Sequence, residues 1–331
     1  MYVGWRELKW ARGRFALIGS VIVLITVLVG LLSGLTKGLG EQSTSAVTGL
    51  RAEELVFGGD GFDSSRVPVD LVSGTTPLGL ATLRGSGSSG QGAVTVIGVP
   101  PASTIAPDSA GVSPGRVVLS EPARELLGGS AVELSGTSFT VVETRGDASY
   151  SHLPVVWASL QDWQRLTGSH GSATVLAAPG PVGPLPSGYD ARTLADSLSA
   201  IGSYSSEHGS LLLIRGFLLA ISALVVGAFF TVWTIQRSGD IAVLKALGAS
   251  TASLLRDALG QAAVVLVVGV GIGSAVAVVA GLAARGAVPF ALDAATLLQP
   301  VVLLGALGLG GAALAVRRVT SIDPLTALAG K

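Results

Sequence analysis

Cysteine is absent from the 331-residue sequence, and charged residues are scarce, at 13%. The lack of thiols excludes disulfides, zinc–thiolate sites and thiol catalysis, so an exported domain must be held together by packing alone. The formal net charge is zero and no long basic or acidic run occurs, which gives no support for nucleic-acid binding. Apolar residues make up 49% of the chain, with a mean hydropathy of +0.64. This composition is typical of a membrane protein.

Two signatures of catalysis are also missing. No G-x-x-x-x-G-K-[ST] occurs, so the chain cannot hold ATP phosphates in the usual way. No Ser, His and Asp set has the spacing of a known motif. The stretch "GSGSSG" at 85–90 matches G-x-G-x-x-G formally, but it opens no apolar helix and is interpreted as a flexible turn. We therefore expect no enzymatic activity and no cofactor bound by this chain.

Four segments are long and apolar enough to cross about 30 Å of hydrocarbon, which takes about 20 helical residues. The predicted transmembrane helices are 15–37, 210–236, 258–284 and 297–316. The first follows four basic residues, as a signal peptide would. Its apolar run is longer than that of a signal peptide, however, and no clean cleavage site follows, so it is expected to remain as an anchor.

Basic residues mark one side of the membrane. They precede the first helix, lie between the second and third, and follow the fourth: Arg6, Lys9, Arg12, Arg14, Arg237, Lys245, Arg256, Arg317, Arg318 and Lys331. By the positive-inside rule these segments, and both termini, are predicted to be cytoplasmic in a multi-pass protein of the cell membrane. Residues 38–209 then form an extracytoplasmic domain with a stalk, 285–296 an outer loop, and 317–331 a cytoplasmic tail.

The predicted outer domain has the pattern of an α+β fold. Short β-prone runs alternate with Gly, Ser and Pro turns: "VPVDLV", "AVTVIGV", "RVVLS", "AVELS", "SFTVVE" and "LPVVWAS". Two helices interrupt them, "SEPARELLG" with Ser120 as N-cap and "SLQDWQRLTG" with Ser159 as N-cap. The fold class is thus an α-helical membrane protein with four transmembrane helices and an inserted extracytoplasmic α+β domain.

Small residues recur every four positions in the first and third predicted transmembrane helices: Gly30, Gly34 and Gly38, and Gly269, Gly273, Ala277 and Gly281. Such ridges let helix backbones approach closely in a membrane. We interpret them as packing surfaces, and their spacing leaves open whether they pack within or between subunits.

The stretch "GDIAVLKALGAS" at 239–250 lies between the second and third predicted transmembrane helices and is longer than a simple chain reversal requires. Ile241, Leu244 and Leu247 fall on one face at helical spacing, and Gly248 is suited to end the helix. This face is predicted either to dock into a partner or to lie on the membrane surface.

The longer stretch "QRSGDIAVLKALGASTASLL" resembles the cytoplasmic segment of FtsX/MacB-type permeases of ABC transporters, whose recurrent form is R-x-x-E-I-x-x-L-(R/K)-A-x-G-A-s. The resemblance extends over the whole chain. An amphipathic cytoplasmic N-terminal helix at 1–14 ("GWRELKWARGRF"), the outer "VVLSEPARELLGGSAVELSGTSFTVVE" and the tail "RRVTSIDPLTALAG" are similar to that family too. One departure is Asp240, where the family usually has Glu.

This resemblance implies a homodimer in the lipid bilayer, bound to two copies of a separate ATPase subunit that holds ATP and Mg²⁺. The segment 237–257 would be the coupling helix that inserts into the ATPase. The residues implied for this coupling are Asp240, Ile241, Leu244, Lys245 and Leu247. The family mostly works by mechanotransmission, in which closure of the ATPase dimer moves the helices and the outer domain.

The candidate cargo-binding residues lie near the outer ends of the first and second predicted transmembrane helices. Positions 39, 43, 46, 50, 53 and 57 follow a helical stripe, which places Glu53 beside Leu50 and Phe57, with Glu54 one position round. A carboxylate on a packing stripe loses solvation unless it is paired or binds something. Arg215 lies a few residues inside helix 2, where a charge usually marks a partner or pathway.

Two interpretations of these charges remain open. In one, Arg215 snorkels to the headgroups and Glu53 is a solvated stalk residue. In the other, Glu53, Glu54, Phe57 and Arg215 surround an outer-leaflet cleft for an amphipathic ligand. Haem would fit this chemistry, with Glu53 as an iron ligand and Arg paired with propionates.

The size and architecture are similar to the haem-exporting branch of this family in Gram-positive bacteria, so haem is the predicted substrate. The alternatives are a non-transporting mechanotransmitter that activates a cell-wall hydrolase, and a lipoprotein or antibiotic exporter. The three histidines are weaker candidates as haem ligands. His152 and His170 lie deep in the predicted outer domain, and His208 is expected in an exposed "SSEHGS" turn.

Overall fold

The computed structural model describes residues 12–236, 239, 243, 247–248, 250–284, 288–291 and 293–320. The chain divides into two compact units. The helical unit comprises Met1–Gly38 and Ser210–Lys331, and the sheet unit comprises Leu39–Gly209. Each unit is described by itself below.

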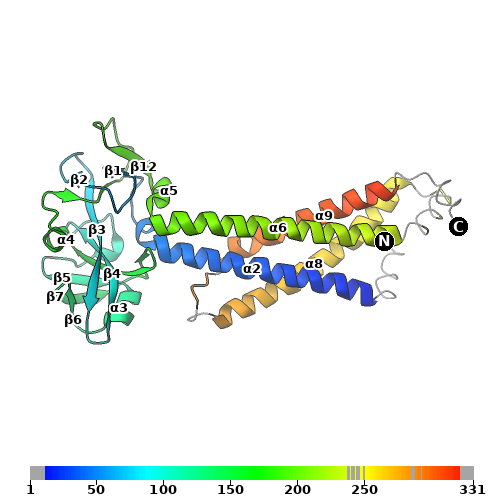
Figure 1. Ribbon diagram of the computed structural model, residues 1–331, viewed down its shortest axis with the longest axis horizontal. Helices are drawn as coiled ribbons and strands as arrows, with labels where there is room; N and C mark the ends of the chain where they lie inside the picture. The colour runs from blue at the N-terminus through cyan, green and yellow to red at the C-terminus, as the bar shows by residue number, and fades with distance from the viewer. Residues whose placement is uncertain are drawn as a thin grey trace. The chain divides into compact units, whose positions relative to one another are not determined.

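The helical unit contains most of four long helices (Figure 1). They are α2 (Arg12–Thr48), α6 (Gly202–Gln236), α8 (Thr251–Ala284) and α9 (Ala294–Thr320). Within the described residues, three helical stretches are long and apolar enough to span a membrane: Ala16–Thr48, Gly202–Gln236 and Leu259–Ala284. In α9 the apolar stretch among these residues is shorter, Val301–Gly311, so the fourth transmembrane helix stays a prediction.

The small-residue ridges of α2 and α8 face each other within one chain. A Cβ added at Gly30 would lie 3.0 Å from the Cβ of Ala277, and one added at Gly273 would lie 2.6 Å from the Cβ of Thr26. In an apolar medium the hydrophobic effect does not drive helices together, so their association depends on van der Waals packing, which close backbone approach of this kind allows. The ridges therefore pack within the subunit, which settles the alternative that their spacing left open.

An aromatic side chain completes this helix contact. A Cβ at either Gly34 or Gly281 would overlap the ring of Phe290, which lies in the connection between α8 and α9. The amide of Ala291 donates to the carbonyl oxygen of Gly34 at 3.1 Å. The two glycines thus form the hole that receives Phe290, and the connection is fastened to α2.

The sheet unit is built on a ten-stranded sheet, and β3 and β4 run antiparallel through its middle (Figure 1). The strands of the unit are β1 (Glu54–Phe57), β2 (Val67–Pro68), β3 (Thr76–Ser86), β4 (Gln91–Val99), β5 (Arg116–Leu119), β6 (Ala131–Leu134), β7 (Thr137–Thr144), β8 (Ser149–Tyr150), β9 (Leu153–Ser159), β10 (Ser172–Ala173), β11 (Val175–Ala178) and β12 (Asp190–Thr193). The order β3-β4-β9-β5-β7-β6 closes on itself because β6 also pairs with β3. Five of the six runs expected as strands correspond to β4, β5, β6, β7 and β9, whereas in "VPVDLV" only Val67–Pro68 forms a strand, as β2. The stretch "GSGSSG" covers the end of β3 and the turn that leads to β4.

Both helices predicted in this region are confirmed, as α3 (Glu121–Leu127) and α4 (Leu160–Thr167). The Ser120 and Ser159 side chains accept hydrogen bonds from the amides of Ala123 and Asp162, as N-caps do. The Trp163 side chain is fully buried. A Cβ at Gly79 or Gly98 would overlap it, so two strand glycines make room for this indole against the sheet.

One prediction about the first helix is wrong. The helical stripe was expected to run from position 39 to 57, but α2 ends at Thr48 and residues Glu54–Phe57 form β1. Gly49 follows the last helical residue, and the apolar run Leu55, Val56 and Phe57 pairs with β11 on one side and β12 on the other. Strand pairing with both neighbours prevails over helical periodicity here because it satisfies the backbone of a buried segment.

Candidate functional site

The three predicted ligand residues near β1 have different surroundings. The Phe57 side chain is fully buried; its ring lies 4.9 Å from that of Phe62, and the Arg192 guanidinium carbon lies 4.8 Å above it. A Glu54 carboxylate oxygen accepts from the amide of Val182 at 2.8 Å, which fastens the loop after β11. Phe57 is therefore a core residue, and its prediction as a ligand contact is wrong.

Glu53 keeps its side chain exposed while its backbone is fixed. Its amide donates to the Ala178 carbonyl oxygen at 2.8 Å, and its own carbonyl oxygen accepts from the Leu194 amide at 2.9 Å. A carboxylate on a backbone held at both ends is well positioned to meet a ligand. Its role as a ligand or iron contact stays a prediction.

Arg215 lies on the inward face of α6. It shares a helical stripe with Leu218, Ser222 and Val226, which are less exposed than Leu213 and Phe217 on the other face, at 66% and 68%. Within the described residues, its Nη2 atom is buried and has no hydrogen-bond partner. An arginine turned toward other helices, with a donor unsatisfied, is ready to bind an anion.

The hydroxyl groups of the same helices contrast with this arginine. Thr26, Ser222 and Thr231 each donate to the carbonyl oxygen four residues earlier, at 2.8, 2.5 and 2.8 Å. In an apolar medium polar groups must be satisfied internally, and these are. The Nη2 atom of Arg215 has no such partner within the described residues, and neither has the buried Ser33 hydroxyl of α2; of these two groups only Arg215 carries a charge.

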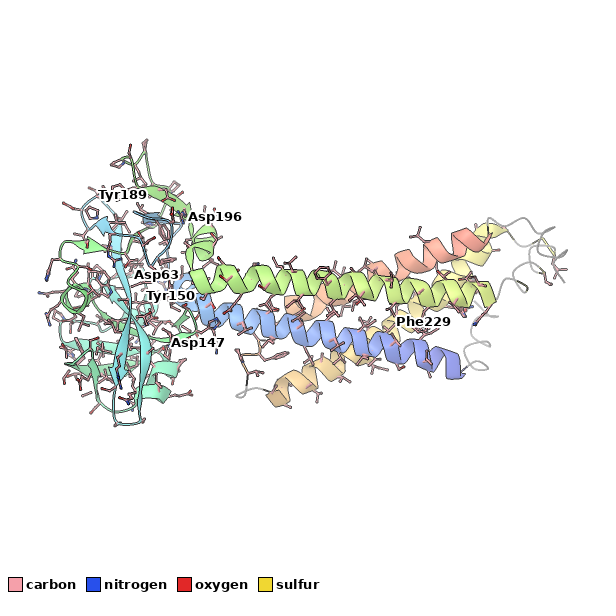
Figure 2. The ribbon with its side chains drawn as sticks, in the orientation of Figure 1. Asp63, Asp147, Tyr150, Tyr189, Asp196 and Phe229 are labelled. Carbon is pink, nitrogen blue, oxygen red and sulfur yellow. The ribbon has the colours of Figure 1, made fainter. Side chains whose placement is uncertain are left out.

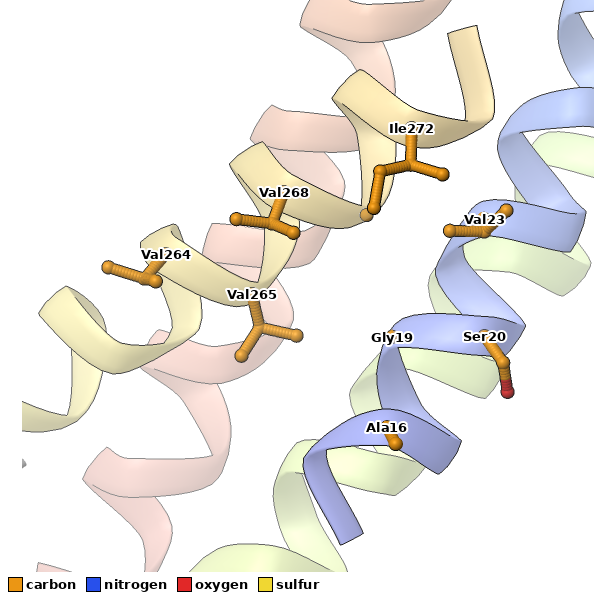
Figure 3. Close-up of a pocket in the computed structure, with 9 residues that line it drawn as sticks. Ala16, Gly19, Ser20, Val23, Val264, Val265, Val268 and Ile272 are labelled. Carbon is orange, nitrogen blue, oxygen red and sulfur yellow. The ribbon is translucent and has the colours of Figure 1, made fainter. Parts of the chain in front are cut away.

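Two apolar cavities of the helical unit lie elsewhere. One, of about 310 Å³, opens between α2 and α8 and is lined by residues that include Gly19, Val23, Val268 and Ile272 (Figure 3). The other, of about 360 Å³, includes Phe229 and Trp233 of α6 in its lining. Neither lining contains a charged side chain or any predicted ligand residue. These cavities are therefore unsuited to the charged end of an amphipathic anion.

Of the predicted coupling residues, Asp240, Ile241, Leu244 and Lys245 lie outside the described residues. Leu247 is described, and its side chain is 80% exposed. Its amide donates to the Val243 carbonyl oxygen at 3.0 Å, and Gly248 has a φ of +93°, as a helix-ending glycine does. The φ of Gly248 suits the predicted helix stop, which stays a prediction because residues 244–246 lie outside the described residues. The most exposed large apolar side chain of the described residues lies directly before this glycine.

The histidines differ from their predicted settings. His208 lies in α6 and not in a turn, and its ring stacks on that of Tyr204 at 5.0 Å. His170 is exposed. His152 lies in the β8–β9 turn, 2.9 Å from Ser43 of α2 and 2.9 Å from Glu207 of α6. This last cluster was missed because its members are far apart in sequence. The described residues contain no group of three His, Asp or Glu side chains suited to a metal ion.

Two groups of the sheet unit have shifted pKa values. Burial, with the nearby Asp63 carboxylate, raises the pKa of Tyr150 (Figure 2). Burial, with the nearby Asp147, raises the pKa of Asp108, while Arg145 opposes the shift. These shifts belong to packed parts of the sheet unit and carry no sign of a catalytic pair.

Comparison with known proteins identifies the permease class. Residues 212–324 match the family described as FtsX-like permease C-terminal. The chain is 26% identical to the "Putative hemin transport system permease protein HrtB" of Staphylococcus epidermidis ATCC 12228, over 100% of this chain and 99% of that protein. It is 25% identical to an uncharacterised ABC transporter permease of Mycobacterium tuberculosis H37Rv, again over 100% of this chain and 99% of the relative.

Among solved structures, the extracellular domain of the noncanonic ABC-type transporter YknZ from Gram-positive bacteria matches with a TM-score of 0.27 and 11% identity. The match covers 38% of this chain and 81% of that one. The sequence comparisons confirm the resemblance to FtsX-like permeases. The chain contains an FtsX-like permease domain, and over its full length it is related to HrtB and other permeases of ABC transporters.

Proposed function

We propose that this ABC transporter permease exports an amphipathic anion, haem in the first instance, from the outer leaflet of the membrane. The chain acts as a homodimer, with both termini in the cytoplasm. Energy comes from two copies of a separate ATPase subunit, which bind ATP and Mg²⁺. Their movement reaches the cargo through the helices, by mechanotransmission.

The observation that carries this proposal is the unpartnered Nη2 of Arg215 on the inward face of an apolar helix. A guanidinium pairs most favourably with a carboxylate or phosphate, which it can bind through two parallel hydrogen bonds. Haem presents two carboxylates on an otherwise apolar ring, so it matches a single cation among apolar side chains. The full-length similarity to a protein named for hemin transport supports the same cargo.

Glu53 is the second proposed cargo contact, through the haem iron, and Glu54 is a weaker one because its carboxylate already accepts from Val182. Phe57 is not included because it is buried in the sheet unit. Coupling to the ATPase is proposed for Asp240, Ile241, Leu244, Lys245 and Leu247. The exposed side chain of Leu247 supports this assignment, since a partner would remove it from water.

The test is a haem titration of the purified dimer in nanodiscs, followed by Soret absorbance. Wild type is expected to bind saturably near one haem per dimer. Arg215→Ala is expected to weaken binding about 10- to 100-fold, the equivalent of one lost charge-assisted hydrogen bond, and Arg215→Lys to restore part of it. Glu53→Ala is expected to weaken binding and to change the Soret maximum, because it removes the iron ligand.

The matched controls are Arg256→Ala and Glu125→Ala, which remove one exposed cation in α8 and one exposed carboxylate in α3. Both are expected to bind haem as wild type does. Equal loss in Arg215→Ala and Arg256→Ala would indicate a nonspecific charge effect and contradict the site. The absence of saturable binding in every sample would reject haem, and would favour pure mechanotransmission or another amphipathic cargo.

A further inference from the structure

The turn between β8 and β9 is conformationally strained. Its two central residues, Ser151 and His152, have φ of +52° and +63°, although neither is glycine. Two consecutive residues in the left-handed region form the hairpin turn that Asn-Gly or Gly-Gly normally occupies. Each non-glycine residue there costs about 1 kcal/mol or more. Contacts outside the hairpin must therefore hold this turn in place.

The first set of contacts joins the turn to α2. The amides of Ser151 and His152 donate to the carbonyl oxygens of Ser43 and Gln42, at 3.0 and 3.1 Å. The hydroxyl of Ser45 accepts from the Ser149 amide at 2.8 Å. The two bonds to Ser43 and Gln42 join backbone to backbone, so no change of rotamer can release them, whereas the bond to Ser45 depends on its side chain.

Apolar packing also holds the β8–β9 turn against α2. Ala46 and Val47 of α2 are each 2% exposed and belong to the same core cluster as Tyr150. The side chain of Ser43 is fully buried. Separating α2 from the turn would expose this apolar surface and leave buried backbone groups unpaired, at a cost of several kcal/mol.

The second set of contacts joins the turn to the first two turns of α6, and it is of a different kind. The Ser151 hydroxyl donates to the Ser203 hydroxyl at 2.9 Å, and the His152 Nε2 lies 2.9 Å from both Glu207 carboxylate oxygens. All of these are side-chain contacts. The His152 and Glu207 side chains are 28% and 40% exposed, so water can replace what they lose. Bonds of this type contribute about 1 kcal/mol or less each.

The start of α6 provides a pivot for such a separation. Ile201, directly before the helix, is 1% exposed and anchored in the core cluster. Gly202 comes next; it is exposed, and a Cβ there would meet nothing within 4 Å. The half-buried Tyr204 is the remaining apolar contact of these turns with the core cluster. A fixed residue followed by an unobstructed glycine allows α6 to swing while Ile201 stays in place.

We propose that the β8–β9 turn is a joint with two unequal sides, fastened permanently to α2 and reversibly to α6. During the transport cycle the start of α6 swings about Gly202 and the contacts of Ser203 and Glu207 with the turn open, while residues 42–47 of α2 stay bonded to the turn. This inference rests on the proposed function, because the swing is driven by the ATPase.

The absence of native cysteine makes the joint directly testable by engineered disulfides in the full chain, assembled with its ATPase in nanodiscs. Ser151→Cys with Ser203→Cys probes the α6 side, where the two hydroxyls lie 2.9 Å apart. Ser45→Cys with Ser149→Cys is the matched pair on the α2 side. The rate of disulfide formation is measured without nucleotide and after trapping with ATP and vanadate, and trapped nucleotide is quantified in each sample.

Trapping is expected to slow the Ser151–Ser203 pair at least about fivefold and to leave the Ser45–Ser149 pair unchanged. Glu207→Ala in the first pair is expected to slow crosslinking without nucleotide as well, while Glu207→Gln, which keeps a hydrogen bond, retains it. Equal rates for the Ser151–Ser203 pair in both states, in a sample with trapped nucleotide, would overturn the joint. Slowing of both pairs would overturn its asymmetry. No nucleotide trapping at all would overturn the proposed function, and the joint with it.

Discussion

The two units of the chain bury apolar side chains to very different extents. In the sheet unit, Leu55, Val96 and Trp163 are each 0% exposed. In the helical unit, Phe217, Leu224 and Val267 are 68%, 72% and 72% exposed, although these residues are equally apolar. The sheet unit folds by removing such side chains from water, whereas the helical unit presents them to an apolar medium. Large side chains therefore stabilise the first unit, and small ones determine packing in the second.

The largest effect is expected from Trp163→Ala. The indole fills the space left by Gly79 and Gly98, so its removal leaves a cavity under β3 and β4. The expected loss is about 3–5 kcal/mol in the free energy of unfolding of the sheet unit. Amide hydrogen exchange of β4 in the full chain measures it. Leu166→Ala, on the same helix but partly exposed, is the control and should cost less than half as much.

The helical unit should respond most strongly to an enlarged small residue. Gly281→Ala places a methyl group where the Phe290 ring lies, so the ring must leave its hole, at a cost of about 1–3 kcal/mol. Thermal unfolding in nanodiscs measures the change. Gly271→Ala in the same α8 helix has open space around it and should be neutral or slightly stabilising. Combining Gly281→Ala with Phe290→Ala should recover part of the loss, and a loss unaffected by Phe290→Ala would contradict the knob-in-hole assignment.

Exposed apolar residues of the helical unit need not all face lipid, and Leu247 tests this distinction. Leu247→Asp is expected to reduce ATP hydrolysis by the assembled complex at least about tenfold, which corresponds to about 1.4 kcal/mol, because it removes the apolar contact proposed between this side chain and the ATPase. The thermal unfolding of the permease should not change. Ser250→Asp, also exposed and three residues later, is the control. Normal stimulation of the ATPase in Leu247→Asp would show that this side chain lies on the membrane surface.

The sequence predicted a structural element correctly where the signal for that element is local, and failed where it depends on distant residues. Strands, caps and turns of the sheet unit were predicted because their signals are local: Ser120 and Ser159 precede their helices, and the β-prone runs are bounded by Gly and Pro. The end of α2 was mispredicted because Leu50 and Phe57 continue a helical spacing, while the pairing of β1 with β11 and β12 depends on residues more than 100 positions away.

The candidate site was predicted less completely for the same reason. Arg215 could be singled out because a charge in an apolar run is a local signal. Phe57 was assigned to the ligand since no local feature distinguishes a core phenylalanine from an exposed one. The cluster of Ser43, His152 and Glu207 is formed only when three distant segments meet, and no short-range pattern indicates it.

The smallest predicted effect concerns an unfavourable charge in the sheet unit. Burial raises the pKa of Asp108 above its usual 3.8, so folding favours the protonated form. Protonation of the Asp108 carboxyl therefore stabilises the folded protein. This stabilisation is complete at pH values below the pKa of Asp108 in the unfolded chain, and it is lost as the pH rises through the pKa of Asp108 in the folded protein. Asp108→Asn should therefore stabilise the sheet unit at pH 7 by less than about 1 kcal/mol, and the gain should shrink toward pH 4. Pulse proteolysis at several pH values, with the exposed Asp70→Asn as control, measures it. A pH-independent gain would mean that the amide acts through packing against Gly146, and that the charge of Asp108 is harmless to the fold.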